Sequence, residues 1–183
     1  MLQQTCSQTV GPFFKIGMTY GELNNMVNDE TQGERIVIRG SVFDGNGNGV
    51  DDAVVEIWQA DAHGVYAHGE DGRHADADPA FFGHGRSSTD DEGKYWFNTI
   101  KPGVVDGMAR HCNVRILMRG LLLHVVTRLY FSDEDNTADE ILKLVPAERR
   151  HTLIAQRDDR FGTPVYHLDF HMQGDQETVF FEP

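Results

Sequence analysis

Two histidines and a carboxylate near the C-terminus have the residue types of a metal site. His167, Asp169 and His171 alternate in a short run, so one straight strand would place them on the same face. This ligand set is typical of non-heme Fe(II). A strand rises by ~3.3 Å per residue, however, so the outer two side chains would lie ~13 Å apart, too far to share one ion. The spacing favours a solvated or salt-bridged strand face.

A second polar run, Asp44-Gly-Asn-Gly-Asn-Gly49, has the alternating oxygen ligands that open a calcium-binding EF-hand loop. Such a loop needs a carboxylate at its twelfth position, which here is Val55. It also needs helices on both sides, whereas the flanking sequence is β-like. Glycine and asparagine supply the positive φ angles of a hairpin turn, so the run predicts a hairpin.

A third group begins at His111. Odd positions from 111 to 119 carry His, Asn, Arg, Leu and Arg, while even positions from 114 to 118 carry Val, Ile and Met. In a strand the odd positions share one face, which puts His111 and Arg119 on the same side. The residues leave two interpretations open for this face: solvent, or the wall of a polar pocket.

The elements that position these groups are mostly strands. Short β-branched and aromatic runs, separated by Gly, Asp and Asn, occupy residues 36–43, 54–58, 95–100, 114–118, 122–130 and 166–170. Helical signals are confined to residues 137–155, where Thr137 and Glu140 form a capping-box pattern and Pro146 suits a first turn. We expect a mostly β fold, a two-sheet β-sandwich with one or two short helices near residues 137–155.

The length of the chain predicts a single domain over residues 1–183. We find no internal repeat and no linker. Two stretches, residues 21–33 and 67–85, read as long loops.

Composition excludes several classes of partner. Sixteen Lys and Arg against 29 Asp and Glu give a net charge of −13, so no basic surface is expected for nucleic acid or anionic lipid. Residues 121–126 form a strongly apolar run too short to span a bilayer. Cys6 and Cys112 lack any metal-binding spacing, and two thiols fit a reducing compartment, so we expect a cytoplasmic chain.

Eight segments carry a resemblance to a known family: residues 7–13, 40–45, 55–61, 82–86, 99–103, 128–131, 150–155 and 174–181. Together they span nearly the whole chain, which resembles the intradiol aromatic-ring dioxygenases. The resemblance implies a β-sandwich. It also implies a ferric ion held by two Tyr and two His, at which O2 opens an aromatic ring between two hydroxyl-bearing carbons.

Carried over position by position, the family's iron ligands are mostly missing. Of the His pair, His111 is retained and the second position is Asn113. One Tyr position corresponds to Val105 and the other falls near Arg73, and an Arg preceding the His pair corresponds to Met108. One ligand of four remains, so the resemblance implies that this chain binds no metal and that His111 marks a relict site.

The loss of these ligands resembles the pattern of an iron-free alpha subunit, which in this family pairs with an iron-bearing beta subunit. The resemblance then implies no catalytic residue in this chain, and Fe(III) held by the partner. It implies substrate-binding roles for Thr9, Gly11 and Pro12 as wall residues, and for Arg119, which would meet the carboxylate of a dihydroxybenzoate. An N-terminal arm, residues 1–33, is expected to make subunit contacts.

Two other functions remain open at this point. One is a homomeric dioxygenase whose iron site uses other residues among the nine His and five Tyr. The other is a non-catalytic β-sandwich that serves as a binding module. Metal analysis separates the first from an iron-free subunit, and co-purification with an iron-carrying chain separates the second.

Overall fold

The fold is mostly β, as predicted. The structure, a computed structural model, describes residues 4–21 and 23–182. Its strands form one hydrogen-bonded path in the order β3-β2-β5-β6-β7-β8-β1-β4, and β9 also pairs with β1. Their bounds are β1 Arg35–Phe43, β2 Val54–Trp58, β3 His84–Ser88, β4 Lys94–Ile100, β5 His111–Leu117, β6 Val125–Phe131, β7 Ile154–Asp158, β8 Val165–His167 and β9 Phe170–His171.

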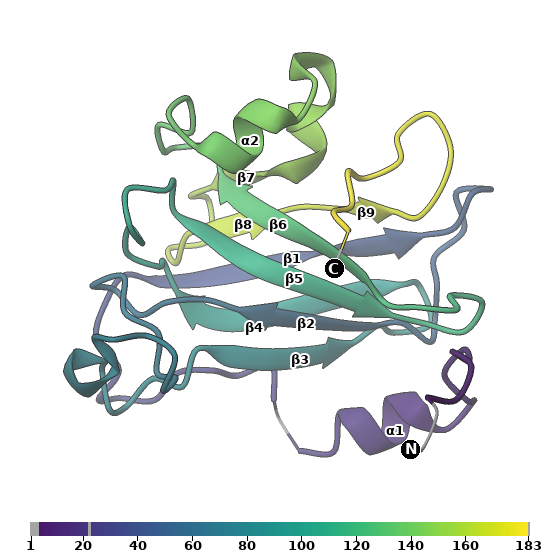
Figure 1. Ribbon diagram of the computed structural model, residues 1–183, viewed down its shortest axis with the longest axis horizontal. Coiled ribbons are helices and arrows are strands. Elements are labelled where there is room, and N and C mark those ends of the chain that lie inside the picture. The colour runs from purple at the N-terminus through teal and green to yellow at the C-terminus, as the bar shows by residue number, and fades with distance from the viewer. Residues whose placement is uncertain (1–3, 22, 183) are drawn as a thin grey trace.

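The path curls so that its two halves pack face to face, which is the predicted sandwich class (Figure 1). Side chains of both halves meet in one core, for example Ile38 and Phe97 from β1 and β4, and Val55, Val114 and Leu129 from β2, β5 and β6. All five are at most 2% exposed. Burying a side chain of this size stabilises the fold by about 1.5 to 3 kcal/mol.

Alternation along β5 determines which side chains enter this core. Cys112, Val114 and Ile116 belong to the core cluster, whereas Asn113 is half-buried and Arg115 is exposed. His111, at the start of the strand, is 3% exposed and lies outside that cluster. The predicted two faces of this strand are therefore confirmed.

Part of the N-terminal arm covers the open edges of the sheet. The carbonyl of Leu23 accepts from the amide of Arg86 in β3, and the carbonyl of Asn24 accepts from the amide of Asn98 in β4. Met26 in turn donates to the carbonyl of Asn98. Residues 23–26 thus lie between the two end strands of the path and satisfy backbone groups that would otherwise be free to pair with another chain.

Four short helical segments accompany the strands: α1 Phe14–Met18, η1 His74–Asp76, α2 Glu140–Leu144 and η2 Ala147–Leu153. The two near residues 137–155 confirm the prediction, but the capping box was wrong. Asp139 caps α2, because its Oδ1 accepts from the amides of Ile141 and Leu142. Thr137 instead donates its hydroxyl to Asp135.

The α1 and η1 segments, and strands β3 and β7, were not predicted; η1 and the start of β3 fall within the stretch 67–85 that was read as a loop. Lys15 donates to the carbonyls of Asp51 and Thr89, both at 2.6 Å, and so holds α1 against the ends of β2 and β3. A five-residue helix depends on such tertiary contacts more than on local propensity. None of the helices in the described part of the chain has the length and apolar character needed to cross a membrane.

A cluster of charges fixes the segment that follows β4. Lys101 is 7% exposed and contacts Asp133 at 2.7 Å and Glu134 at 2.5 Å. Burial opposes its charged form, but these hydrogen bonds outweigh it and raise the pKa of Lys101 to about 12. Arg157 and the hydroxyl of Tyr166 also donate to Asp133, at 2.8 and 3.1 Å. The cluster ties the Lys101 segment to the loop after β6 and to β7 and β8.

Replacing Asp139 with Ala should destabilise the chain by about 3 kcal/mol, since it removes a helix cap and leaves buried donors unpaired. Besides capping α2, this buried carboxylate accepts from the amide of Ala109 and the hydroxyl of Tyr130, both at 3.0 Å. Urea unfolding measures the change. The exposed Asp175 gives a control, Asp175→Ala, and equal effects of the two substitutions would contradict the assigned role.

Asp133→Asn should cost about 2 kcal/mol at pH 7 by weakening the bonds to Lys101 and Arg157. Burial opposes ionisation of Asp133, but Lys101 and Arg157 together lower its pKa. A lowered folded pKa stabilises the protein above the unfolded value of ~3.9, and this stabilisation is lost as pH falls through the folded pKa. The difference between wild type and Asp133→Asn in urea unfolding should therefore shrink in acid, and a difference independent of pH would contradict the assignment. Asp91→Asn, at an exposed position, is the control.

Candidate functional site

The first two polar groups do not form metal sites. Strand β8 ends at His167 and β9 begins at Phe170, so the intervening Asp169 is not on one straight strand with both histidines. Its carboxylate accepts from the amide of Ser41 at 2.8 Å. His167 contacts Arg39 at 3.3 Å, and the His171 ring stacks on a neighbouring phenylalanine.

The run after β1 is a turn, as predicted. Asp44 Oδ1 accepts from the backbone amides of Asn46 and Asn48, both at 2.8 Å. The hydrogen bond from the Asn48 amide is the main reason why the pKa of Asp44 is lowered. The Asp44 carboxylate thus accepts hydrogen bonds from the backbone of its own turn.

The structure gathers most of the positions that correspond to the family's iron site, while His111 is not among the residues that line the cavity. Arg73, Val105, Met108 and Asn113 all line one cavity of about 550 Å³. They come from the loop around η1, from the segment after β4 and from β5. In Figure 1 these loops lie together at the left end of the sandwich, at the start of β5. We call this cavity the relict site.

The side chains at the two positions of the family's His pair, His111 and Asn113, are hydrogen-bonded within the chain, and only Asn113 lines the cavity. His111 Nδ1 donates to the carbonyl of Ala109 at 2.8 Å, which fixes the tautomer. Burial, and the nearby Arg128, lower the pKa of His111, so its imidazole is neutral at pH 7. Asn113 Nδ2 donates to the hydroxyl of Tyr66 at 3.1 Å, and burial raises the pKa of that phenol.

Arg73 places a cation where the family has a phenolate. Its guanidinium donates to Asp71 and to the carbonyl of Gly64, at 3.2 and 3.0 Å, and Asp106 lies 3.8 Å away. Backbone amides of Tyr66 and Arg73 lower the pKa of Asp71 to about 2, so the pair stays ionised. The guanidinium therefore links the η1 loop to the segment after β4.

The residues present do not fit a ferric ion. Fe(III) favours hard anionic donors. The cavity is lined by the Tyr66 phenol and by carboxylates, including Asp71 and Asp106. The phenol accepts from Asn113, and Asp71 and Asp106 both lie within 4.0 Å of the Arg73 guanidinium. Val105 is 6% exposed and provides no donor, while Arg73 would repel the ion. Across residues 4–21 and 23–182, no three His, Cys, Asp or Glu side chains are grouped so as to hold a metal.

The predicted substrate-binding residues lie at the other end of the molecule. Thr9 Oγ1 accepts from the amide of Gly120 at 3.0 Å, which brings Thr9 beside Arg119. Arg119 Nε contacts the carboxylate of Asp52. In the described part of the chain, the two terminal nitrogens of Arg119 make no hydrogen bond. Gly11 and Pro12 follow as exposed residues at the start of α1.

Arg119 continues the outward row of β5, because it contacts Asp52 as Arg115 contacts Glu56, but within this chain it lies far from the relict site. Strand β5 ends at Leu117, and Arg119 lies in the turn beyond it. Six steps of ~3.3 Å place the two ends of β5 ~20 Å apart, with His111 at one end and Arg119 past the other. Arg119 and Thr9 therefore form a separate group, which we call the arm site because Thr9 belongs to the N-terminal arm.

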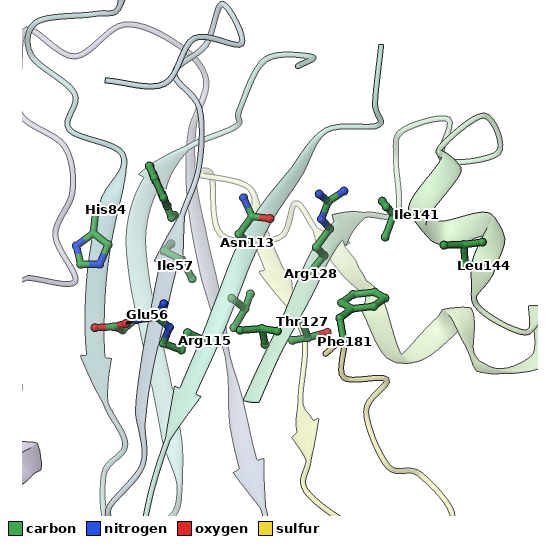
Figure 2. A pocket seen from close by; sticks show the side chains of 13 residues that line it. Glu56, Ile57, His84, Asn113, Arg115, Thr127, Arg128, Ile141, Leu144 and Phe181 are labelled. Atoms are coloured by element: carbon green, nitrogen blue, oxygen red, sulfur yellow. Dashed lines mark ion pairs between the residues drawn. The ribbon is translucent and has the colours of Figure 1, made fainter. Parts of the chain in front are cut away.

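The sequence did not indicate a role for one further cation, Arg128. Arg128 of β6 points into a pocket on the outer face of β2, β5 and β6, near Asn113 and Ile141 (Figure 2). Antiparallel pairing places Arg128 directly opposite Asn113. Alternation along β6 could have suggested its face, but the sequence does not specify the register between strands.

The comparisons with known proteins agree with this geometry. The family model described as dioxygenase matches residues 10–174. The alpha chain of protocatechuate 3,4-dioxygenase from Burkholderia cepacia is 43% identical over 99% of this chain and 98% of its own length. The alpha chain from Pseudomonas putida is 38% identical over 100% and 98%. The beta chain from Burkholderia cepacia is 38% identical, over 73% of this chain and 60% of its own.

Solved structures show the same fold. The dioxygenase domain of a carbohydrate-binding fusion protein from Streptomyces sp. SirexAA-E aligns with a TM-score of 0.66, at 24% identity, over 85% of this chain and 88% of its own. Catechol 1,2-dioxygenase from Pseudomonas arvilla C-1 aligns with a TM-score of 0.63, at 21% identity, over 87% and 60%. With the family match and the near-full-length relatives, they show that this chain belongs to the intradiol ring-cleavage dioxygenase family.

Proposed function

We propose that this chain is the alpha subunit of a protocatechuate 3,4-dioxygenase. The complete enzyme cleaves protocatechuate with O2 between its two hydroxyl-bearing carbons and gives 3-carboxy-cis,cis-muconate. The observation that carries the proposal is near-full-length similarity to two alpha chains. It is joined to the loss of three of the four iron-ligand positions, which leaves the relict site unable to do this chemistry.

In this proposal the ferric ion belongs to a beta subunit that pairs with this chain. The relatives include chains named alpha and beta of one enzyme from the same organism. Because the relict site holds a cation at Arg73 and an apolar side chain at Val105, this chain contributes through surface groups to an active site on its partner.

The arm site is the part of the surface that would meet the substrate. Protocatechuate carries a carboxylate, which a guanidinium holds through two parallel hydrogen bonds. Asp52 contacts Arg119 through Nε and leaves both terminal nitrogens of the guanidinium available. Thr9, Gly11 and Pro12 would form the neighbouring wall of the partner's site.

The first residues of the arm are suited to a subunit contact. Phe13, Ile16 and Tyr20 are 77%, 68% and 88% exposed, and large apolar side chains grouped in this way mark protein interfaces. Residues 23–26 are committed to the chain's own sheet. The proposed contact with the beta subunit therefore involves the arm before residue 21. We also propose that residues 1–183 form a single domain.

We also propose a cytoplasmic location. Cys6 and Cys112 are both free thiols in the structure, one exposed and one buried. Burial raises the pKa of the Cys112 thiol, which keeps it in the unreactive form. Two unpaired thiols suit a reducing compartment.

Arg119→Ala should raise KM for protocatechuate in the complete enzyme by about 10- to 150-fold. This range corresponds to the loss of about 1.5 to 3 kcal/mol of charge-assisted hydrogen bonding. Steady-state kinetics of the alpha–beta complex measure the effect. The value of kcat should change little, because the carboxylate that Arg119 would bind is not part of the bond that is cleaved.

Catechol provides a matched probe, since it has the two hydroxyl groups and no carboxylate. KM for catechol should be the same with Arg119 and with Arg119→Ala. An unchanged KM for protocatechuate, or an equal loss for both compounds, would remove Arg119 from carboxylate recognition. Arg149→Ala, at an exposed position on η2, controls for the loss of a surface charge.

The full chain, purified alone and incubated with ferric iron, should remain colourless. A ferric–phenolate absorption band requires tyrosinate ligands, and the relict site offers Val105 and Arg73 in those positions. Metal analysis and the visible spectrum test this expectation together. Stoichiometric iron with a visible band would overturn the iron-free assignment and favour a homomeric dioxygenase.

A further inference from the structure

The pocket around Arg128 is separate from the arm site and lies next to the relict site. It has a volume of about 610 Å³, within the usual range of small-molecule sites. It shares Trp58 and Asn113 with the relict site. Most of its wall is apolar and comes from β2, β6, α2 and the C-terminal segment: Trp58, Val126, Ile141, Leu144 and Phe181.

Arg128 is the pocket arginine that makes no ion pair with the described residues, although its charge helps to lower the pKa of Asp139 from a greater distance. Its terminal nitrogen contacts the sulfur of Met108 at 3.7 Å, and no carboxylate of the described residues lies within 4.0 Å. Arg115, which lines the same pocket, lies 3.6 Å from Glu56. That glutamate also pairs with Arg86, so its charge is neutralised by two arginines. The pocket is therefore locally positive in a chain of net charge −13.

The histidines near this pocket do not supply that charge. Burial lowers the pKa of His84, and the neighbouring Arg86 and Arg115 lower it further against the opposing effect of Glu56. His111 is neutral for the reasons given above. The positive charge is thus held by arginine, which remains ionised at any physiological pH.

Strand register sets the distance between the cation and the aromatic wall. Trp58 pairs with Asn113, and Asn113 pairs with Arg128, so the three side chains form a row across β2, β5 and β6. Two strand spacings of ~4.8 Å place the ends of the row about 10 Å apart. A single aromatic ring bearing a carboxylate fits this span, with Phe181 beside Arg128 (Figure 2).

We infer that this pocket binds a small aromatic carboxylate. The carboxylate pairs with the guanidinium of Arg128, which is half-buried and so less screened by water. The ring lies over Asn113 and contacts Trp58 and Phe181, where aromatic packing adds to the burial of apolar area. The inference stands on this chain alone and does not require the proposed function.

Fluorine NMR of the full chain labelled with 5-fluorotryptophan tests the inference. The chain has two tryptophans: Trp58 in this pocket, and Trp96 in a second cavity lined by Arg39, Asp90 and Asp169. Benzoate is the probe, and Trp58→Phe assigns the resonances. We expect a saturable shift of the Trp58 signal, with the Trp96 signal unchanged. Parallel shifts of both signals would indicate nonspecific binding and overturn the inference.

Two variants and one neutral probe isolate the carboxylate contact. Arg128→Gln should weaken benzoate binding by at least about tenfold, and benzamide should bind the unchanged chain more weakly by a similar factor. Leu144→Asp should also weaken binding, since Leu144 is 79% exposed and its replacement adds a negative charge to the rim without disturbing the core. Arg39→Gln, at another half-buried strand arginine, should leave the affinity unchanged.

Equal affinity of benzoate for Arg128→Gln and the unchanged chain would overturn the inference, as would equal affinities for benzoate and benzamide. The same titration of the labelled chain in complex with its iron-bearing partner gives a further test. If benzoate shifts the Trp58 signal in the free chain and not in the complex, the partner covers this face, and the pocket is an interface and not a ligand site.

Discussion

The alternation of side chains along β5 is the constraint on which the rest of the structure depends. This strand pairs with β2 on one side and β6 on the other, so its inward residues bind the sheet to the core. Its outward residues face the relict site and the Arg128 pocket, and the turn beyond it carries Arg119. A shift of one residue would exchange the two faces, burying Arg115 and exposing Val114. The core and the candidate sites are therefore set by one register.

Charge pairing explains how so acidic a chain can bind an anion. Lys101 and Arg157 compensate Asp133, and Asp71 is matched by Arg73. Against this background, Arg119 is paired with Asp52 through Nε and keeps its terminal nitrogens as donors, whereas Arg128 makes no ion pair with the described residues. Recognition of a benzoate is thus restricted to positions where a guanidinium is left available.

Sequence reasoning identified the elements better than their arrangement. The alternating runs predicted most strands and the sandwich class, because a strand buried on one face alternates apolar and polar residues along the sequence. The capping residue of α2 was misplaced, since Thr137 and Asp139 both suit a cap and only tertiary contacts with Ala109 and Tyr130 select Asp139. The α1 helix depends on Lys15, whose partners lie far away in the sequence. The shared face of His111 and Arg119 did not reveal their separation, because the two residues flank opposite ends of β5. The place of Arg128 requires the β5–β6 register, which no local pattern contains.

The central claim is that this chain works as an iron-free subunit beside an iron-bearing one. Native mass spectrometry of the complex, formed by co-expression with a beta chain that has the Tyr and His ligands, tests this most directly. The account predicts equal numbers of the two chains and one iron for each pair, with the iron remaining on the beta chain when the subunits are separated in the gas phase. An iron-loaded assembly made of this chain alone would contradict it.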